Sequence, residues 1–141
     1  LLRLPGARDA TNPAEAGSTD GELDLRALYG VGFPIDGKPA FVDVQAAYRI
    51  RQDAPPDEWR LDATFGIRLH PELLLLAQSF NVISNGDGKA PYGDTRYHKA
   101  QLSLVWDIRP DVSLQFGGVT TYAGENALQE NGLVAGIWYR F

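Results

Sequence analysis

Hydrophobic and polar residues alternate along most of this chain with a period of two. The clearest run extends from Glu58 to His70, where apolar side chains at odd positions alternate with polar or small ones at even positions. A period of two puts successive side chains on opposite faces of an extended strand, whereas a helix repeats about every 3.6 residues. The run therefore predicts a β-strand with one apolar and one polar face.

The same alternation predicts an all-β chain with seven long strands. They cover residues 22–33, 42–51, 58–70, 73–84, 97–108, 112–122 and 131–141. The strand at 73–84 is ambiguous, because apolar residues occur at both even and odd positions. We assign four of them to its apolar face: Leu74, Leu76, Phe80 and Val82. This choice turns Ser79 and Asn81 toward the polar face and leaves Gln78 as an exception.

Short and long connections alternate between these strands. The short ones, residues 34–38, 70–72 and 109–111, carry Pro, Gly and Asp where tight hairpin turns require them. The long ones, residues 6–21, 52–57, 85–96 and 124–130, are rich in Gly, Asp, Asn, Pro and Ala. Tight turns at one end and longer loops at the other are typical of an antiparallel up-and-down membrane barrel.

The last predicted strand, Asn131–Phe141, carries the most specific pattern. Its apolar positions are Leu133, Ala135, Ile137, Tyr139 and Phe141. The segment resembles the closing strand of Gram-negative outer-membrane β-barrel proteins, in which a terminal Phe, an aromatic residue two positions before it and alternating apolar residues form the signal read by the barrel-assembly machinery. The resemblance implies a location in the bacterial outer membrane. It also implies three partners: the lipid bilayer, lipopolysaccharide and, through Asn131–Phe141, the assembly machinery.

We therefore expect a single domain over residues 1–141 that folds as an antiparallel up-and-down transmembrane β-barrel. It has about eight strands, with residues 1–5 as the end of an earlier one, or it forms the C-terminal part of a larger barrel. No apolar run approaches the roughly 18 residues of a membrane helix, but a membrane barrel hides its hydrophobicity in alternation. Neither an initiating Met nor an export signal is present, so we expect any signal to have been removed.

The apolar face has two interpretations: contact with lipid, or the core of a soluble lipocalin-like barrel that binds a hydrophobic ligand. We favour lipid, because tilted strands of about 11–13 residues span a hydrocarbon layer of roughly 25–30 Å. Aromatic residues also gather near the strand ends of this face, like the interfacial girdles of membrane barrels. The aromatic residues assigned to the two interfaces are Phe33, Tyr48, Trp59, Trp106, Tyr122, Tyr139 and Phe141.

The polar face carries acids and bases in nearly equal numbers. If the apolar face meets lipid, these residues line the lumen, where opposite charges on neighbouring strands pair. The predicted lumen-facing network comprises Glu22, Asp24, Arg26, Asp43, Arg49, Arg51, Glu58, Arg60, Asp62, Arg68, Lys99, Asp107 and Arg140. It either fills a narrow barrel as a salt-bridge network or forms the charged wall of an aqueous pore.

Composition and motifs narrow the function classes. The net charge of -5 argues against a nucleic-acid partner, and the absence of Cys excludes disulfides and thiol chemistry. His70 and His98 show neither metal-ligand spacing nor a Ser partner, so we predict no catalytic residue, metal or cofactor. A pairing of His98 with Asp94, or with a serine from another loop, is the enzymatic alternative. The turn at 84–88 lacks the further carboxylates of a calcium loop.

We therefore expect a non-enzymatic outer-membrane protein. It is either a passive channel for small solutes or a structural protein whose outer loops bind a protein partner. The loop at 85–96, with Tyr92 and the adjacent Tyr97, is the expected recognition surface. The alternatives are the soluble lipocalin-like binder and, less favoured, an outer-membrane enzyme.

Overall fold

The computed structural model describes residues 2–3, 22–51, 56–85, 95–125 and 129–141. These residues form one antiparallel sheet in which each strand pairs with its neighbours in sequence. The strands, in sheet order, are β1 (Leu2–Arg3), β2 (Glu22–Ile35), β3 (Lys38–Arg51), β4 (Asp57–His70), β5 (Leu73–Asn85), β6 (Arg96–Arg109), β7 (Val112–Glu125) and β8 (Asn131–Tyr139). The predicted all-β, up-and-down architecture is confirmed. A membrane-crossing apolar helix is absent from the described part of the chain.

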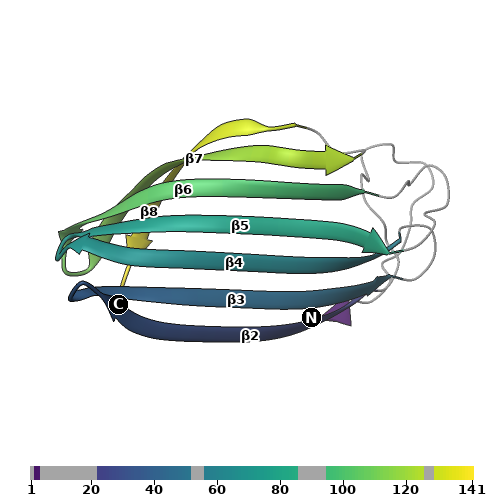
Figure 1. Cartoon of the computed structure of the whole chain (residues 1–141), viewed down its shortest axis with the longest axis horizontal. Helices are drawn as coiled ribbons and strands as arrows, with labels where there is room; N and C mark the ends of the chain where they lie inside the picture. Colours follow the sequence, from purple (N-terminus) through teal and green to yellow (C-terminus); the bar gives the residue numbers. More distant parts are fainter. Residues whose placement is uncertain (1, 4–21, 52–55, 86–94, 126–128) are drawn as a thin grey trace.

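Tight turns join the strands at one end of the sheet, the left end in Figure 1, which we call the turn end. Between β2 and β3 the turn narrows to two residues, Asp36 and Gly37, with φ of 48° and 75°. Positive φ at both central positions matches a type I′ hairpin, which Asp-Gly favours. Pro71–Glu72 and Pro110–Asp111 make the other two tight turns. At the opposite end, the loop end, the connections are longer, as predicted.

The sheet curls around the direction of its strands (Figure 1), with β8 passing behind the strands in front. One cavity is lined by residues from each of the strands β2 to β8. The curl therefore places β2 and β8 on the same cavity. In the described residues, β8 pairs only with β7, and β1 covers β2 only at Glu22 and Leu23. Within the described residues, the strands therefore form a curved sheet whose two edges are not paired with each other.

Cross-strand pairing defines two faces, because residues directly opposite each other point to the same side of a sheet. The concave face borders the cavity and includes Asp43, Thr64, Gln78 and Gln101. The convex face carries the large apolar residues of the alternation, such as Leu25, Leu104 and Phe116, all of which are exposed. The polar side of the pattern is therefore inside the curve and the apolar side is outside.

The sequence-based assignment of β5 is wrong. Leu76 pairs with Gly66 and Val82 with Arg60, so these residues and their even-numbered neighbours Leu74, Gln78 and Phe80 lie on the concave face. Ser79 and Asn81 lie on the convex face, opposite Ala63 and Leu61. The cause is a β-bulge between Arg68 and His70, which leaves an extra residue on β4 and reverses the side on which every β5 residue points.

The reversal creates the apolar core of the sheet. Leu74, Leu76 and Val105 form a buried cluster on the concave face, and Phe41 packs against it. Phe41 lies opposite Gly66, where a Cβ atom would stand only 2.2 Å from the Phe41 ring. Gly66 is required here because the aromatic ring covers its backbone, a known device for closing a gap at a strand glycine.

Candidate functional site

The concave face gathers the charged residues that the sequence predicts to line a lumen, and it separates them along the strands. The loop-end group is Asp24, Arg26, Arg49, Arg51, Glu58 and Arg60, with Glu22 opposite Arg51 in the register. The turn-end group is Arg68, Asp107 and Arg140. Asp43, Asp62 and Lys99 lie between the two groups.

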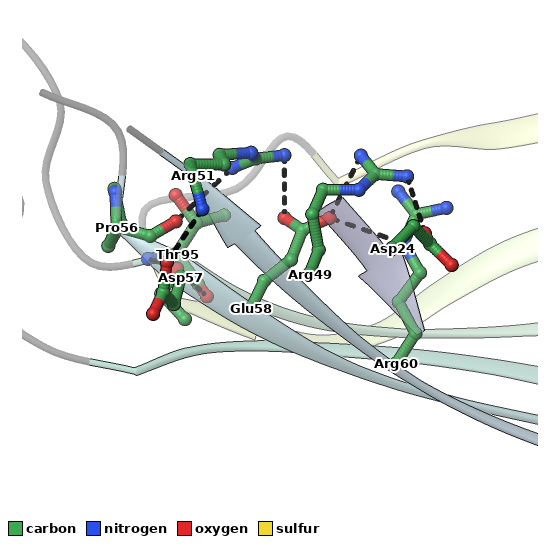
Figure 2. A network of polar contacts seen from close by, with 9 residues as sticks. Asp24, Arg49, Arg51, Pro56, Asp57, Glu58, Arg60 and Thr95 are labelled. Atoms are coloured by element: carbon green, nitrogen blue, oxygen red, sulfur yellow. Dashed lines mark hydrogen bonds and ion pairs between the residues drawn. The ribbon is translucent and has the colours of Figure 1, made fainter. Parts of the chain in front are cut away.

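The loop-end group is a connected network of ion pairs (Figure 2). Arg49 bridges two strands, since its guanidinium lies 3.2 Å from Asp24 and 3.2 Å from Glu58. Glu58 is buried and also contacts Arg51 at 3.1 Å and Arg60 at 3.3 Å. Because a buried carboxylate is costly without compensation, the three arginines around Glu58 offset part of the cost of burying it on the wall.

The turn-end group centres on Asp107. Its carboxylate accepts hydrogen bonds from Arg68 at 2.6 Å, Arg140 at 3.1 Å and the Ser113 hydroxyl. Arg68 comes from β4 and Asp107 from β6, so this ion pair spans the intervening strand β5. Both arginines also donate to backbone carbonyls of the turns, at Pro71 and Pro110. The group therefore links two hairpin turns, through Pro71 and Pro110, to side chains of the concave face.

Between the two charged groups lies a cavity of about 730 Å³. Its side-chain lining combines polar residues with aromatic and aliphatic ones: Asp43, Thr64, Gln78, Gln101 and Gln115 with Phe41, Phe80, Trp138, Val31, Val42, Leu76 and Val134. Of the ion pairs among described residues, none joins β2 or β3 to β7 or β8 across this space. The charged residues thus run along the wall and leave the interior hollow.

Glycines on the two edge strands help to keep the interior hollow. At Gly32 and Gly136, the atom nearest to an added Cβ would be 3.8 Å away, so larger side chains would have room there. At Gly30, a Cβ atom would lie 3.3 Å from Asp43 Oδ2, and the Asp43 side chain would have to shift slightly. Packing therefore does not explain why these positions lack larger side chains. Their absence leaves space on the concave face that side chains would otherwise occupy.

The convex face carries the aromatic residues predicted for the membrane interfaces. Phe33, Trp59, Trp106, Tyr122 and Tyr139 are exposed, as is Phe141 at the chain end. Tyr48 is half-buried because its ring packs on Trp59, with centroids 4.5 Å apart, and its hydroxyl donates to Asp57 at 3.0 Å. Trp59 and Tyr48 lie toward the loop end and Trp106 and Tyr139 toward the turn end.

One polar group interrupts the convex face near the loop end. His98 Nδ1 lies 2.7 Å from Asn81 Oδ1, and the His98 ring stacks on Tyr122 with centroids 5.9 Å apart. The Asn81 amide donates to Ser79 and to the Leu61 carbonyl. These polar atoms are satisfied by one another, which lowers the cost of placing them on an apolar face.

The enzymatic and metal-binding alternatives gain no geometry from the described residues. Within them, no group of three or more His, Asp or Glu residues could hold a metal ion. Asp94, Tyr92, residues 86–88 of the turn at 84–88 and most of the loop at 85–96 lie outside the described residues. Tyr97 lies on the concave face opposite Val82, with the Lys99 ammonium 5.2 Å from its ring centroid.

No protein-family model matches the chain, and no curated protein or solved structure is similar enough to count as a match. The site is therefore assigned from its own geometry. Sequence reasoning placed the charged residues but missed the part of the cavity wall formed by Leu76, Gln78 and Phe80. The run of four leucines at 73–76 was the available signal, because it marks a strand that is apolar on both faces.

Proposed function

We propose that this chain forms the wall of a transmembrane β-barrel in a bacterial outer membrane, and that its concave face lines an aqueous path for small polar solutes. One observation carries the proposal: the apolar face of the alternation is convex and exposed, while the charged face is concave. A soluble lipocalin-like barrel needs the reverse placement, with the apolar face around a core. A membrane barrel needs the placement found here, because lipid surrounds it and water fills it.

Strand length and direction support the membrane barrel. Strands β2 to β7 have 13 or 14 residues, long enough at a tilt of about 40° to cross a hydrocarbon layer of roughly 25 Å. Because neighbours alternate in direction, β2 and β8 run parallel to each other, whereas β1 runs antiparallel to both. Closure through the edge that β1 begins to cover therefore preserves antiparallel pairing around the barrel, as bacterial membrane barrels require.

The hollow interior supports a channel over a plugged structural barrel. The charged residues pair along the wall, and the edge glycines leave the cavity open. In a plugged barrel, side chains of opposite charge would meet across the lumen.

The three tryptophans test which face meets lipid. Trp59 and Trp106 are convex, whereas Trp138 is concave and donates a hydrogen bond to Gln115 at 2.9 Å. We expect variants that retain a single tryptophan, inserted into vesicles with brominated acyl chains, to show strong quenching of Trp59 and Trp106 and weak quenching of Trp138. A water-soluble quencher such as acrylamide should give the opposite order. A monomer in detergent-free buffer, or Trp138 as the residue most quenched by lipid, contradicts the proposal.

Planar-bilayer recording tests the solute path. We expect discrete single-channel steps from the wild-type protein and a smaller conductance from Gly30→Trp, which places an indole in the cavity. Gly118→Trp is the matched control, because Gly118 points to the convex face and its substitution should leave the conductance unchanged. Membrane insertion without conductance would instead favour a structural barrel.

A further inference from the structure

A row of polar side chains crosses the concave face near the middle of the strands. Asp43, Thr64, Gln78 and Gln101 are consecutive cross-strand partners on β3 to β6. Directly opposite residues share a face and lie about 5 Å apart, so these four form a continuous polar row. The Gln78 amide donates to Thr64 Oγ1 at 3.2 Å and the Gln101 amide donates to Gln78 Oε1 at 3.1 Å. All four residues line the 730 Å³ cavity.

The row keeps hydrogen-bonding capacity directed at a ligand. Asp43 uses Oδ1 to accept from Gln45, and no described residue donates to its Oδ2. Gln101 donates through Nε2, while no hydrogen bond from the described residues reaches its Oε1. Gln115 accepts from Trp138 and leaves its own amide hydrogens without a partner in this part of the structure. Two acceptors, Asp43 Oδ2 and Gln101 Oε1, and one donor, the Gln115 amide, therefore border the same cavity. This mixture suits hydroxyl groups because each hydroxyl both donates and accepts.

Within the described residues, the rest of the lining offers no unpaired cationic side chain to an anionic solute and adds flat apolar surfaces. Asp43 is the single ionisable residue among those that line the cavity, and the arginines of both end groups are engaged with carboxylates. Phe41, Phe80 and Trp138 contribute aromatic rings to the same lining. A cavity that combines aromatic surfaces with a few placed polar groups orients a ligand that has both apolar and hydroxyl-bearing sides.

We infer that this cavity is a binding site for a small, neutral, polyhydroxylated solute of mono- or disaccharide size. The inference rests on the proposed function, because it takes the lumen of the barrel as the solute's path. The polar row supplies hydrogen bonds to the hydroxyl groups, and the aromatic residues cover the C–H faces of the ring.

Trp138 provides a direct reporter of binding. In a Trp59→Phe, Trp106→Phe background in lipid vesicles, titration with maltose should change Trp138 fluorescence saturably. Gluconate, an anion, and cyclohexanol, with one hydroxyl, should bind at least about tenfold more weakly, because a site built for several hydroxyl groups rejects ligands that leave its polar atoms unpaired. Gln78→Leu and Gln101→Leu should each raise the Kd for maltose about tenfold or more. Gln129→Leu, at an exposed position outside the cavity, is the matched control and should leave the Kd unchanged.

A second variant guards against misfolding of the Gln variants. Gly30 lies on an exposed edge strand, and a side chain there would enter the cavity beside Asp43 Oδ2. Gly30→Leu should therefore abolish the maltose response without altering the amides. Parent-like binding by Gln78→Leu and Gln101→Leu, tighter binding of gluconate than of maltose, or no response to maltose from a protein that conducts would overturn the inference and leave the channel intact. Loss of lipid quenching and conductance, with maltose binding retained in detergent micelles, would instead overturn the proposed function and keep the sugar site.

Discussion

The central strands and the edge strands of the sheet differ in what covers their concave face. On β5 and β6, Leu74, Leu76 and Val105 are between 1% and 7% exposed and pack together with Phe41. On β2 and β8, the concave positions include Gly30, Gly32, Gly132 and Gly136, and few side chains of these strands are buried. The centre of the sheet is therefore packed like the core of a globular protein, and the edges are not.

This contrast indicates that the centre of the sheet provides packing and its edges provide space. In the proposed barrel, a wall around water has no continuous apolar core, so it needs a local one to fix the register of its strands. Strands β5 and β6 supply it together with Phe41 of β3, and an ion pair from Arg68 on β4 to Asp107 on β6 spans β5. The edge strands contribute space instead, and the cavity extends to both of them. Substitutions at matched positions in the two regions should therefore have unequal effects.

The largest difference is expected for an added carboxylate. Leu76 and Val134 both border the cavity on the concave face, but Leu76 is 3% exposed and Val134 is half-buried on an edge strand. Leu76→Asp buries a charge that has no cationic partner and should lower the free energy of unfolding by more than about 4 kcal/mol. Val134→Asp should cost less than about 1 kcal/mol, because water reaches the new carboxylate. Urea unfolding in lipid vesicles measures both, and equal losses would show that the central strands have no special role.

The second largest effect is expected at the loop-end ion-pair network. Glu58 is 7% exposed and contacts Arg49, Arg51 and Arg60. Glu58→Gln keeps the side-chain volume but removes the charge that these guanidiniums share, so we expect a loss of about 3 kcal/mol. Adding Arg60→Gln should restore part of that loss by removing one uncompensated cation. Non-additive urea midpoints of the single and double variants are the required readout, and strict additivity would contradict a shared network.

Two of the three register shifts in the described strands, those beside tight turns, explain how far the sequence could predict this fold. Bulges occur beside two of the tight turns, between Arg68 and His70 and between Asp107 and Arg109. Each reverses the facing of the strand that follows the turn. After the second bulge, Ser113 and Gln115 alternate with Leu114 and Phe116, so the polar pattern alone assigned β7 correctly. After the bulge between Arg68 and His70, the leucine run on β5 offers no such pattern. Only the cross-strand register shows which face of the sheet each β5 side chain lies on.

The candidate site likewise has features that the alternation predicted and features that depend on the cross-strand register. Charged residues of the wall follow clear alternations on β2, β3 and β4, and the sequence placed them on one face. Their grouping at the two ends depends on which strands are neighbours, and Arg68 reaches Asp107 across a whole strand. The polar row was missed because it passes through Gln78, the residue that the assumed facing of β5 made an exception. Which residues meet at the site therefore depends more on the cross-strand register than on the residue types along each strand.

A smaller difference is expected between two concave glycines. At Gly117, between the central strand β6 and the edge strand β8, a Cβ atom would lie 2.3 Å from the Leu102 carbonyl oxygen. At Gly136 on β8, the nearest atom would be 3.8 Å away. Gly117→Ala should therefore cost about 1–3 kcal/mol through overpacking, whereas Gly136→Ala should be neutral or slightly stabilising. Urea midpoints of the two variants check this, and a larger loss at Gly136 would contradict the packing contrast.

The smallest effect is expected at an ion pair on the edge side. Lys99 lies 2.5 Å from Glu130, just before β8, and the Glu130 side chain is 55% exposed. Solvent screens such a pair, so Glu130→Gln should change the free energy of unfolding by less than about 1 kcal/mol. Raising the salt concentration should erase even that difference, whereas the loss caused by Glu58→Gln should persist because the Glu58 carboxylate is itself buried. A salt-insensitive loss of about 3 kcal/mol for Glu130→Gln would mean that another segment buries the Glu130–Lys99 pair beside β8. The packed part of the sheet would then extend beyond the central strands.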